Sequence, residues 1–256
     1  QPRYRLNEVA AFVASGLEDL SISRSTVKWG IPVPGDDAQT IYVWIDALTN
    51  YLSALDFGGD RVKYKKFWLE GETCHLLGKE ISRFHAVYWP AFLKAANLPL
   101  PQREFIHGWI LKDNQKMSKS LGNTVDAGEL ADEFGPDALR YFLMREVPLG
   151  QDGTYSDEIL IERINADLAN DLGNTANRLL QMTMQYRDGI VPASAATSEF
   201  SQACASAHEK YLTAMEAFAS KEALDAVWKL LPEIGSLLQN REPRKHARAA
   251  SPALAA

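Results

Sequence analysis

Apolar positions in the first 110 residues alternate between short β-type runs and stripes at helical spacing. Residues 40–44 and 73–77 are β-branched or apolar runs, and each is followed by a segment whose apolar residues recur every three or four positions. A third apolar run covers residues 104–111. Because strands that alternate with helices form parallel sheets, this pattern predicts an α/β fold with a parallel sheet over this part of the chain.

The helices expected beside these strands carry one apolar face each. A short helix is expected around residues 7–13, ended by Ser15 and Gly16, and Asp46 is the expected cap of the helix after the first strand. The face of that helix consists of Trp44, Ala47, Leu48, Tyr51 and Leu55. The next helix, residues 80–92, has an inner face of Glu80, Ile81, Phe84, His85 and Tyr88.

Both faces start at the carboxyl end of a strand, where open α/β sheets bind their ligands. Apolar residues at this spacing usually form core, and a lone histidine on such a face is more often a core residue than a ligand contact. Two neighbouring faces with aromatic residues favour a different interpretation. They predict one apolar pocket that contains an imidazole and a carboxylate.

The second part of the chain has a helical period throughout. Residues 126–134 and a helix starting at Pro136 precede three long amphipathic helices, the first capped by Ser156, and short connections predict an antiparallel bundle. We expect domains at residues 1–150 and 151–240. Residues 241–256 are basic and alanine-rich without an apolar period, so we expect a frayed or disordered tail there.

Composition narrows the class of protein. The 256 residues are 46% hydrophobic, and no apolar run approaches the length of a membrane span. Together with the absence of a secretory signal, this leads us to expect a cytoplasmic protein without membrane contact. Two cysteines predict free thiols and no disulfide framework or zinc ribbon. The net charge of −6 disfavours wholesale coating of nucleic acid but leaves a local RNA site open.

Residues 116–120, Lys-Met-Ser-Lys-Ser, are the most distinctive stretch of the sequence. Two lysines separated by small residues and followed by Gly122 suit a mobile loop that closes over phosphate oxygens. An arbitrary stretch of this kind is more often a solvated surface loop. No P-loop and no dinucleotide-binding G-x-G-x-x-G motif occurs, so a P-loop nucleotide site and a nicotinamide dehydrogenase receive no support.

The pentapeptide resembles the second signature of the class I aminoacyl-tRNA synthetases. With residues 16–24, 42–51 and 78–85, the chain from about residue 3 to residue 240 resembles the methionyl-tRNA synthetases. The resemblance implies part of a Rossmann-like parallel-sheet nucleotide-binding domain, followed by an all-α anticodon-binding bundle. It also implies ATP-dependent activation of methionine and transfer to tRNA(Met), with ATP and Mg²⁺ as cofactors.

The resemblance also assigns site residues. The methionine side chain would contact Trp44, Ala47, Leu48, Tyr51, Ile81, Phe84 and His85. ATP would contact Gly78, Glu80, Ile110, Lys116, Ser118 and Lys119, with Lys116 and Lys119 as the catalytic pair on the phosphates. Asn174 and Arg178 would read the anticodon. No metal ligands are assigned, and no zinc site is expected in this chain.

Two departures from the family leave a second interpretation open. No His-x-Gly-His signature, which the family uses on ATP, occurs in the sequence, and the Ala-Pro-Trp segment that follows the family's bundle has no counterpart in residues 241–256. The alternative is therefore a non-catalytic fragment or RNA-binding module, or a subunit that needs a separate N-terminal half.

Overall fold

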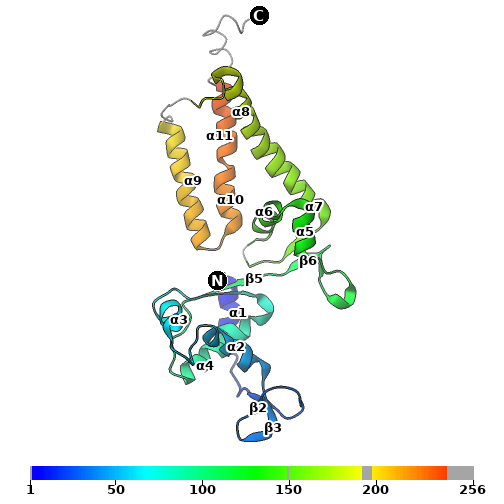
Figure 1. Cartoon of the computed structure of the whole chain (residues 1–256), viewed down its shortest axis with the longest axis vertical. Helices are drawn as coiled ribbons and strands as arrows, with labels where there is room; N and C mark the ends of the chain where they lie inside the picture. The colour runs from blue at the N-terminus through cyan, green and yellow to red at the C-terminus, as the bar shows by residue number, and fades with distance from the viewer. Residues whose placement is uncertain (1, 149, 192–197, 241–256) are drawn as a thin grey trace, which may run out of the picture. The chain divides into compact units, whose positions relative to one another are not determined.

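The computed structural model describes residues 2–148, 150–191 and 198–240, and the expected tail at 241–256 lies outside them (Figure 1). The chain forms two compact units, Gln1–Trp109 and Ile110–Ala256. Each unit has its own core, so the two are described in turn.

The first unit opens with a helix and a small antiparallel sheet. Helix α1 (Arg3–Ala14) ends before Gly16, whose φ of 98° is left-handed backbone that glycine adopts without strain, which confirms the predicted helix and its end. Strands β1 (Ser23–Arg24), β2 (Pro32–Val33) and β3 (Asp36–Ile41) follow, in the antiparallel order β1-β3-β2.

The strand predicted over residues 40–44 is wrong in extent and in partner. Helix α2 (Val43–Ser53) begins with Tyr42 as its N-cap, so Trp44 is helical and Asp46 lies in the first turn. A carboxylate in the first turn still interacts favourably with the positive end of the helix dipole. Strand β3 pairs antiparallel and stands outside the parallel sheet, because β-propensity reports only a residue's fit to a pleated surface and leaves its partner open.

The parallel pair of strands lies in the middle of the first unit. Strands β4 (Cys74–Gly78) and β5 (Arg103–His107) run in register from Cys74↔Arg103 to Gly78↔His107. Between them the chain forms η2 (Lys79–Ile81), η3 (Phe84–Tyr88) and α4 (Trp89–Ala95). The strand predicted over residues 73–77 and the helix after it are confirmed here. The strand predicted over residues 104–111 is confirmed at its start and wrong in extent, since the chain leaves the sheet at Gly108 and Trp109 and β6 (Ile110–Lys112) joins another sheet.

A largely aromatic core holds the first unit together. Helix α2 packs against α3 (Val62–Tyr64), η1 (Lys65–Leu69) and α4 through Leu48, Leu52, Tyr64, Trp68, Trp89 and Leu93. Leu48 and Leu93 are 0% and 1% exposed, and burial of each such side chain contributes about 2 kcal/mol. This core fixes the face of α2 that carries the predicted site residues.

The second unit starts with a three-stranded sheet and two short helices. Strand β6 pairs with β7 (Gln115–Lys116) and runs parallel to β8 (Gly153–Tyr155), a strand that sequence reasoning missed. After η4 (Lys119–Leu121), helix α5 (Ala127–Phe134) is capped by Asp126, and α6 (Pro136–Glu146) follows with proline in its first turn. Phe142, Tyr155 and Leu160 form the core of this part.

The rest of the second unit is helical, as predicted. Helix α7 (Asp157–Arg163), capped by Ser156, continues through η5 (Ile164–Gly173) into α8 (Asn174–Arg187). Helix α9 (Ser198–Glu216) packs against α10 (Ser220–Trp228), where buried Ala207, Ala223 and Ala226 allow close approach (Figure 1). The third predicted helix is two segments, because α11 (Leu230–Asn240) starts after a break at Lys229.

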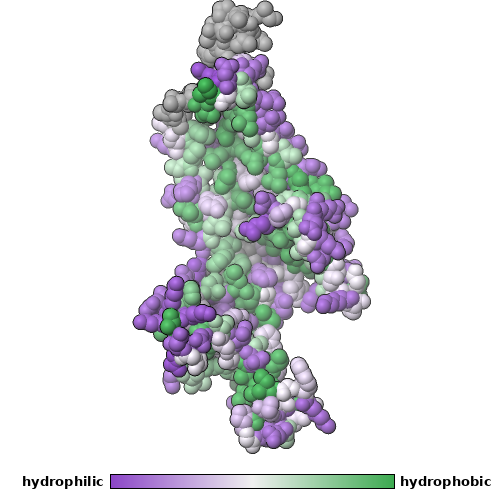
Figure 2. Space-filling model, in the orientation of Figure 1, coloured by the Kyte–Doolittle hydropathy of each residue, from purple (hydrophilic) through white to green (hydrophobic). Residues whose placement is uncertain are grey.

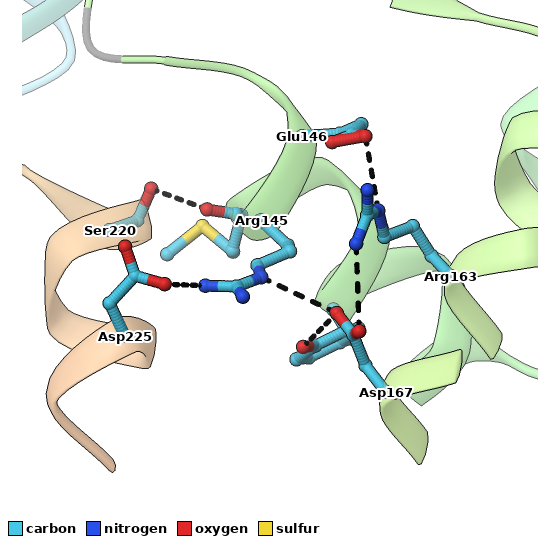
Figure 3. A network of polar contacts seen from close by, with 8 residues as sticks. Arg145, Glu146, Arg163, Asp167, Ser220 and Asp225 are labelled. Carbon is cyan, nitrogen blue, oxygen red and sulfur yellow. Dashed lines mark hydrogen bonds and ion pairs between the residues drawn. The ribbon is translucent and has the colours of Figure 1, made fainter. Parts of the chain in front are cut away.

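A polar network ties three of these helices together (Figure 3). Arg145 of α6 lies between Asp225 of α10, which it contacts through Nη1, and Asp167 of η5, whose Oδ2 is 3.4 Å from its Nε. Asp167 is 6% exposed and also accepts a 2.7 Å hydrogen bond from the hydroxyl of Tyr141. Because the buried carboxylate of Asp167 is paired with several donors, the network holds η5 and α10 against α6.

Apolar side chains also reach the surface of the chain (Figure 2). Leu76 in β4 is 64% exposed, and Leu180 and Met184 in α8 are 65% and 66% exposed. Among the described residues, no helix combines the length and the hydropathy that a membrane crossing requires.

Candidate functional site

The apolar faces of α2 and η3 meet in one aromatic cluster. The rings of Trp44 and Phe84 stack with centroids 4.0 Å apart and planes 10° from parallel. The ring of His85 stands edge-on to Trp44 at 6.1 Å and to Tyr51 at 5.7 Å. Four of the predicted pocket residues, from helices that are adjacent to different strands, are therefore brought together.

A hydrogen bond between Tyr51 and His85 fixes the polar end of this cluster. The Tyr51 hydroxyl lies 2.8 Å from His85 Nε2, and His85 Nδ1 lies 3.0 Å from the carbonyl oxygen of Ile81. A carbonyl only accepts, so Nδ1 carries the proton of the neutral ring and Nε2 accepts from the tyrosine hydroxyl. Burial lowers the pKa of His85, which keeps the ring neutral, although the bond to Ile81 opposes this shift.

His75 belongs to the same cluster, and sequence reasoning missed it. Its ring lies 4.2 Å from that of Tyr51 and 5.9 Å from that of His85. Burial, with the neighbouring His85, lowers the pKa of His75 to about 4, and within the described part of the chain its Nε2 has no hydrogen-bond partner. Strand alternation gave a signal, because His75 and Leu77 share one face of β4 and both are buried.

The other residues assigned to the pocket differ in exposure. Leu48 is enclosed by the core of the first unit, whereas Ala47 is exposed on the next face of α2. Ile81 ends η2 and is half-buried, and its carbonyl oxygen orients His85. Trp89 is 2% exposed and lies 6.1 Å from the ring of Tyr51, so it extends the cluster beyond the predicted set.

Residues at the carboxyl ends of β4 and β5 form a second group. A Cβ atom on Gly78 would lie 2.6 Å from Oε2 of Glu80, so the carboxylate rests against backbone that only glycine leaves open. The indole Nε1 of Trp109 donates a 2.8 Å hydrogen bond to the same oxygen. The Glu80 carboxylate is thus held at the edge of the parallel sheet.

The lysine loop lies in the second unit and is braced by Asn123. Asn123 Oδ1 accepts from the backbone N–H of Ser118 at 2.8 Å, and its Nδ2 donates to the carbonyl oxygen of Lys116 at 3.2 Å. The Ser118 hydroxyl caps η4 by accepting from the N–H of Leu121, and Gly122 ends the turn at a φ of 64°. The backbone is therefore ordered while the side chains of Lys116 and Lys119 are exposed, as phosphate contacts require.

Three more assigned residues also lie in the second unit. Ile110 opens β6 and is 37% exposed. Asn174 and Arg178 are exposed one turn apart in the first half of α8, so their polar groups face solvent on one side of the helix. No group of three or more histidine, cysteine, aspartate or glutamate side chains within the described ranges could hold a metal ion.

Comparisons with known proteins agree with one another. Residues 1–180 match the family model described as tRNA synthetases class I (M). The methionine–tRNA ligase of Brucella suis is 50% identical over 246 residues, which cover 94% of this chain and 47% of that protein. Methionine–tRNA ligase 1 of Bacillus cereus is 47% identical over 250 residues, which cover 95% of this chain and 38% of that protein.

A solved structure shows the same similarity. The methionyl-tRNA synthetase of Mycobacterium tuberculosis, in complex with methionyl-adenylate, superimposes with a TM-score of 0.88 at 44% identity and covers 99% of this chain and 50% of that one. The chain thus spans about half the length, or less, of the relatives that it matches. Because the family model covers most of the chain and the relatives match nearly all of it, the chain belongs to the methionyl-tRNA synthetases of class I.

Proposed function

We propose that this chain supplies the methionine pocket, part of the ATP site, the lysine loop and the anticodon-reading helix of a methionine–tRNA ligase. The observation that carries the proposal is the joined cluster of Trp44, Tyr51, Phe84 and His85, an apolar site with one oriented polar pair. Its support is a relative whose solved structure holds methionyl-adenylate, the activated form of this amino acid.

The cluster suits a thioether side chain. Aromatic walls favour a polarizable sulfur, which makes weakly attractive contacts with rings that a methylene group makes less well. The single N–H of His85 donates to the carbonyl oxygen of Ile81, and its ring lone pair accepts from the Tyr51 hydroxyl. His85 therefore acts by fixing the position of that hydroxyl. The position of that hydroxyl would then favour binding of methionine over its methylene analogue norleucine.

The family resemblance assigns the nucleotide contacts residue by residue. Gly78 and Glu80 would bind the ribose, Ile110 the adenine, and Ser118 with the two lysines the phosphates. Mg²⁺ would accompany ATP, since this ion commonly keeps phosphate and water oxygens as ligands. Lys116 and Lys119 would stabilise the charge that develops on the departing pyrophosphate.

The proposed reaction consists of two successive displacements. The methionine carboxylate attacks the α-phosphorus of ATP, the bond to the bridging oxygen breaks, and pyrophosphate leaves with methionyl-adenylate formed. A hydroxyl of the terminal tRNA ribose then attacks the methionyl carbonyl, and AMP leaves. The protein contributes positioning and charge stabilisation to both steps.

Recognition of tRNA(Met) would take place on α8. Asn174 and Arg178 each present hydrogen-bonding groups to solvent, and proteins read single-stranded RNA through such contacts to splayed bases. We propose that residues 1–150 are the catalytic part, which belongs to a Rossmann-like domain, and that residues 151–240 are the all-α anticodon-binding bundle.

The parallel sheet supports the proposal that the catalytic site needs further chain. Among the described residues β4 and β5 are the sheet's two strands, and Leu76 is 64% exposed on its outer face. Parallel sheets are covered on both faces in stable domains. We propose that the half of the synthetase length not represented here pairs along this sheet and completes the ATP site.

Methionine-dependent exchange of pyrophosphate into ATP tests this function. The chain would be assayed alone and with an added chain that carries the N-terminal half of the synthetase fold. We expect exchange only in the completed mixture, and loss of exchange when Trp44→Ala replaces the wild-type chain. Absence of exchange in the completed mixture, together with retained binding of tRNA(Met), would favour the alternative of a non-catalytic RNA-binding module.

A further inference from the structure

At the edge of the parallel sheet, Glu80, one of the assigned ATP residues, joins a contact with two side chains outside that set, Trp109 and Lys79. Trp109 Nε1 donates to Glu80 Oε2 at 2.8 Å, and Nζ of Lys79 lies 4.0 Å from the centroid of the Trp109 ring. Lys79 and Glu80 follow β4, whereas Trp109 follows β5. Because Gly78 and His107 are paired in register, both segments leave the sheet at the same edge.

This contact restricts the Glu80 carboxylate. A glutamate on an exposed segment samples many rotamers, and a ligand that needs one of them must order the side chain on binding. The indole N–H removes much of that freedom before a ligand arrives. A carboxylate has about four acceptor positions on its two oxygens, and the indole, which is a donor only, occupies one of them.

The ring itself is held in place from a second side. The Lys79 ammonium lies over the aromatic face, an attractive contact for a cation, while Nε1 at the ring edge points to Glu80. Lys79 and Glu80 are neighbours in sequence, so one indole bridges the two consecutive side chains. The position of Trp109, directly after β5 and Gly108, makes this geometry a consequence of the sheet register.

We propose that Trp109 is a positioning residue for ATP. Its indole N–H holds the Glu80 carboxylate, over Gly78, in the orientation that accepts the ribose hydroxyls. The inference rests on the proposed role of Glu80 in ribose binding and adds a residue that acts through it. Trp109→Phe is the matching perturbation, because the phenyl ring keeps an aromatic face for Lys79 and lacks the N–H.

The contact can be tested on this chain alone by NMR. The indole N–H resonance of Trp109, assigned by its loss in Trp109→Phe, should shift in Glu80→Ala because the hydrogen bond to a carboxylate is lost. The indole resonance of Trp228, whose Nε1 has no hydrogen-bond partner in the described part of the chain, should not move. An unchanged Trp109 resonance in Glu80→Ala would overturn the inference.

The functional consequence is tested by a double-mutant cycle in the completed exchange assay. We expect Trp109→Phe to raise KM for ATP about fivefold to tenfold, with kcat and KM for methionine unchanged, which corresponds to about 1 kcal/mol, the contribution of one typical hydrogen bond. In the Glu80→Ala background the same substitution should change KM for ATP by less than about twofold, since the group it positions is gone. Trp228→Phe is the matched control and should leave KM for ATP unchanged.

The outcomes separate the inference from the proposed function. Equal effects of Trp109→Phe with and without Glu80 would overturn the positioning role and leave the ribose role of Glu80 intact. A normal KM for ATP in Glu80→Ala would overturn both. A fall in kcat and in melting temperature together with a rise in KM for methionine in Trp109→Phe would show a structural role instead and would also overturn the inference.

Discussion

Replacement of Tyr51 by phenylalanine removes one oxygen from the centre of the proposed methionine pocket. The hydroxyl donates to Nε2 of His85 at 2.8 Å, and His85 is 2% exposed, so water does not replace the lost donor freely. The imidazole cannot switch its proton to Nε2 without breaking the Nδ1 bond to Ile81. The substitution therefore leaves a buried acceptor without a donor.

The magnitude follows from this arrangement. A buried acceptor that loses its partner costs about 1–3 kcal/mol, whereas the phenyl ring keeps the aromatic contacts of Tyr51 with His75 and Trp89. We expect the free energy of unfolding to fall by about 2 kcal/mol with an unchanged urea m-value. Tyr88→Phe on the adjacent η3 is the control, because within the described residues its hydroxyl has no hydrogen-bond partner, and it should change stability by less than about 0.5 kcal/mol.

The same substitution should affect selectivity in the completed enzyme. With the hydroxyl removed, the ratio of kcat/KM for methionine to that for norleucine should fall, and His85→Ala should lower the same ratio because it frees the tyrosine. Urea unfolding of the chain and exchange assays with both amino acids measure the two effects. Stability equal to that of Tyr88→Phe, together with an unchanged ratio, would refute this view of the pocket.

Three further substitutions test other parts of the account. Lys119→Ala should leave folding intact and raise the activation free energy of adenylate formation by roughly 3–4 kcal/mol, with little change in methionine affinity. Single-turnover kinetics measures this effect, and a large loss of methionine affinity at normal turnover would contradict the role of Lys119. Asp167→Asn should destabilise the helical unit by about 2–3 kcal/mol, measured by chemical denaturation, and an unchanged midpoint would show that the network is not stabilising. His75 has a pKa of about 4 in the folded chain, below its ordinary value, so the unfolded chain binds the extra proton and stability falls as pH drops from about 6.5 to about 4. His75→Phe should reduce that loss by about 3 kcal/mol in urea titrations at several pH values, and an equal acid loss in both proteins would argue against a buried neutral His75.

The helical faces could be predicted from the sequence because their signal is local. Trp44, Leu48 and Tyr51 recur at helical spacing, and the structure has them on one side of α2. Ser156 and Asp126 likewise mark the starts of their helices, because their side-chain oxygens accept hydrogen bonds from backbone N–H groups of the first turn. The aromatic cluster was predicted from two such faces, although β3, the strand before α2, lies outside the parallel sheet that contains β4.

What was missed depends on partners that are distant in sequence. Strand β8 has three residues, too few for a period, and it exists because β6 pairs with it. The run at 104–111 breaks because the chain turns at Gly108 and Trp109 bonds to Glu80, a residue 29 positions away. His75 looked like an ordinary strand residue, since its neighbours Tyr51 and Trp68 come from other segments.

A structure of this chain, completed by the N-terminal half of the synthetase and bound to methionyl-adenylate, would show where the methionyl group lies. We expect the thioether among Trp44, Tyr51 and Phe84, with the Tyr51 hydroxyl still donating to His85, and the ribose hydroxyls on Glu80. A methionyl side chain bound outside the cluster of α2 and η3, or an intact cluster with no ligand at saturating concentration, would contradict this expectation.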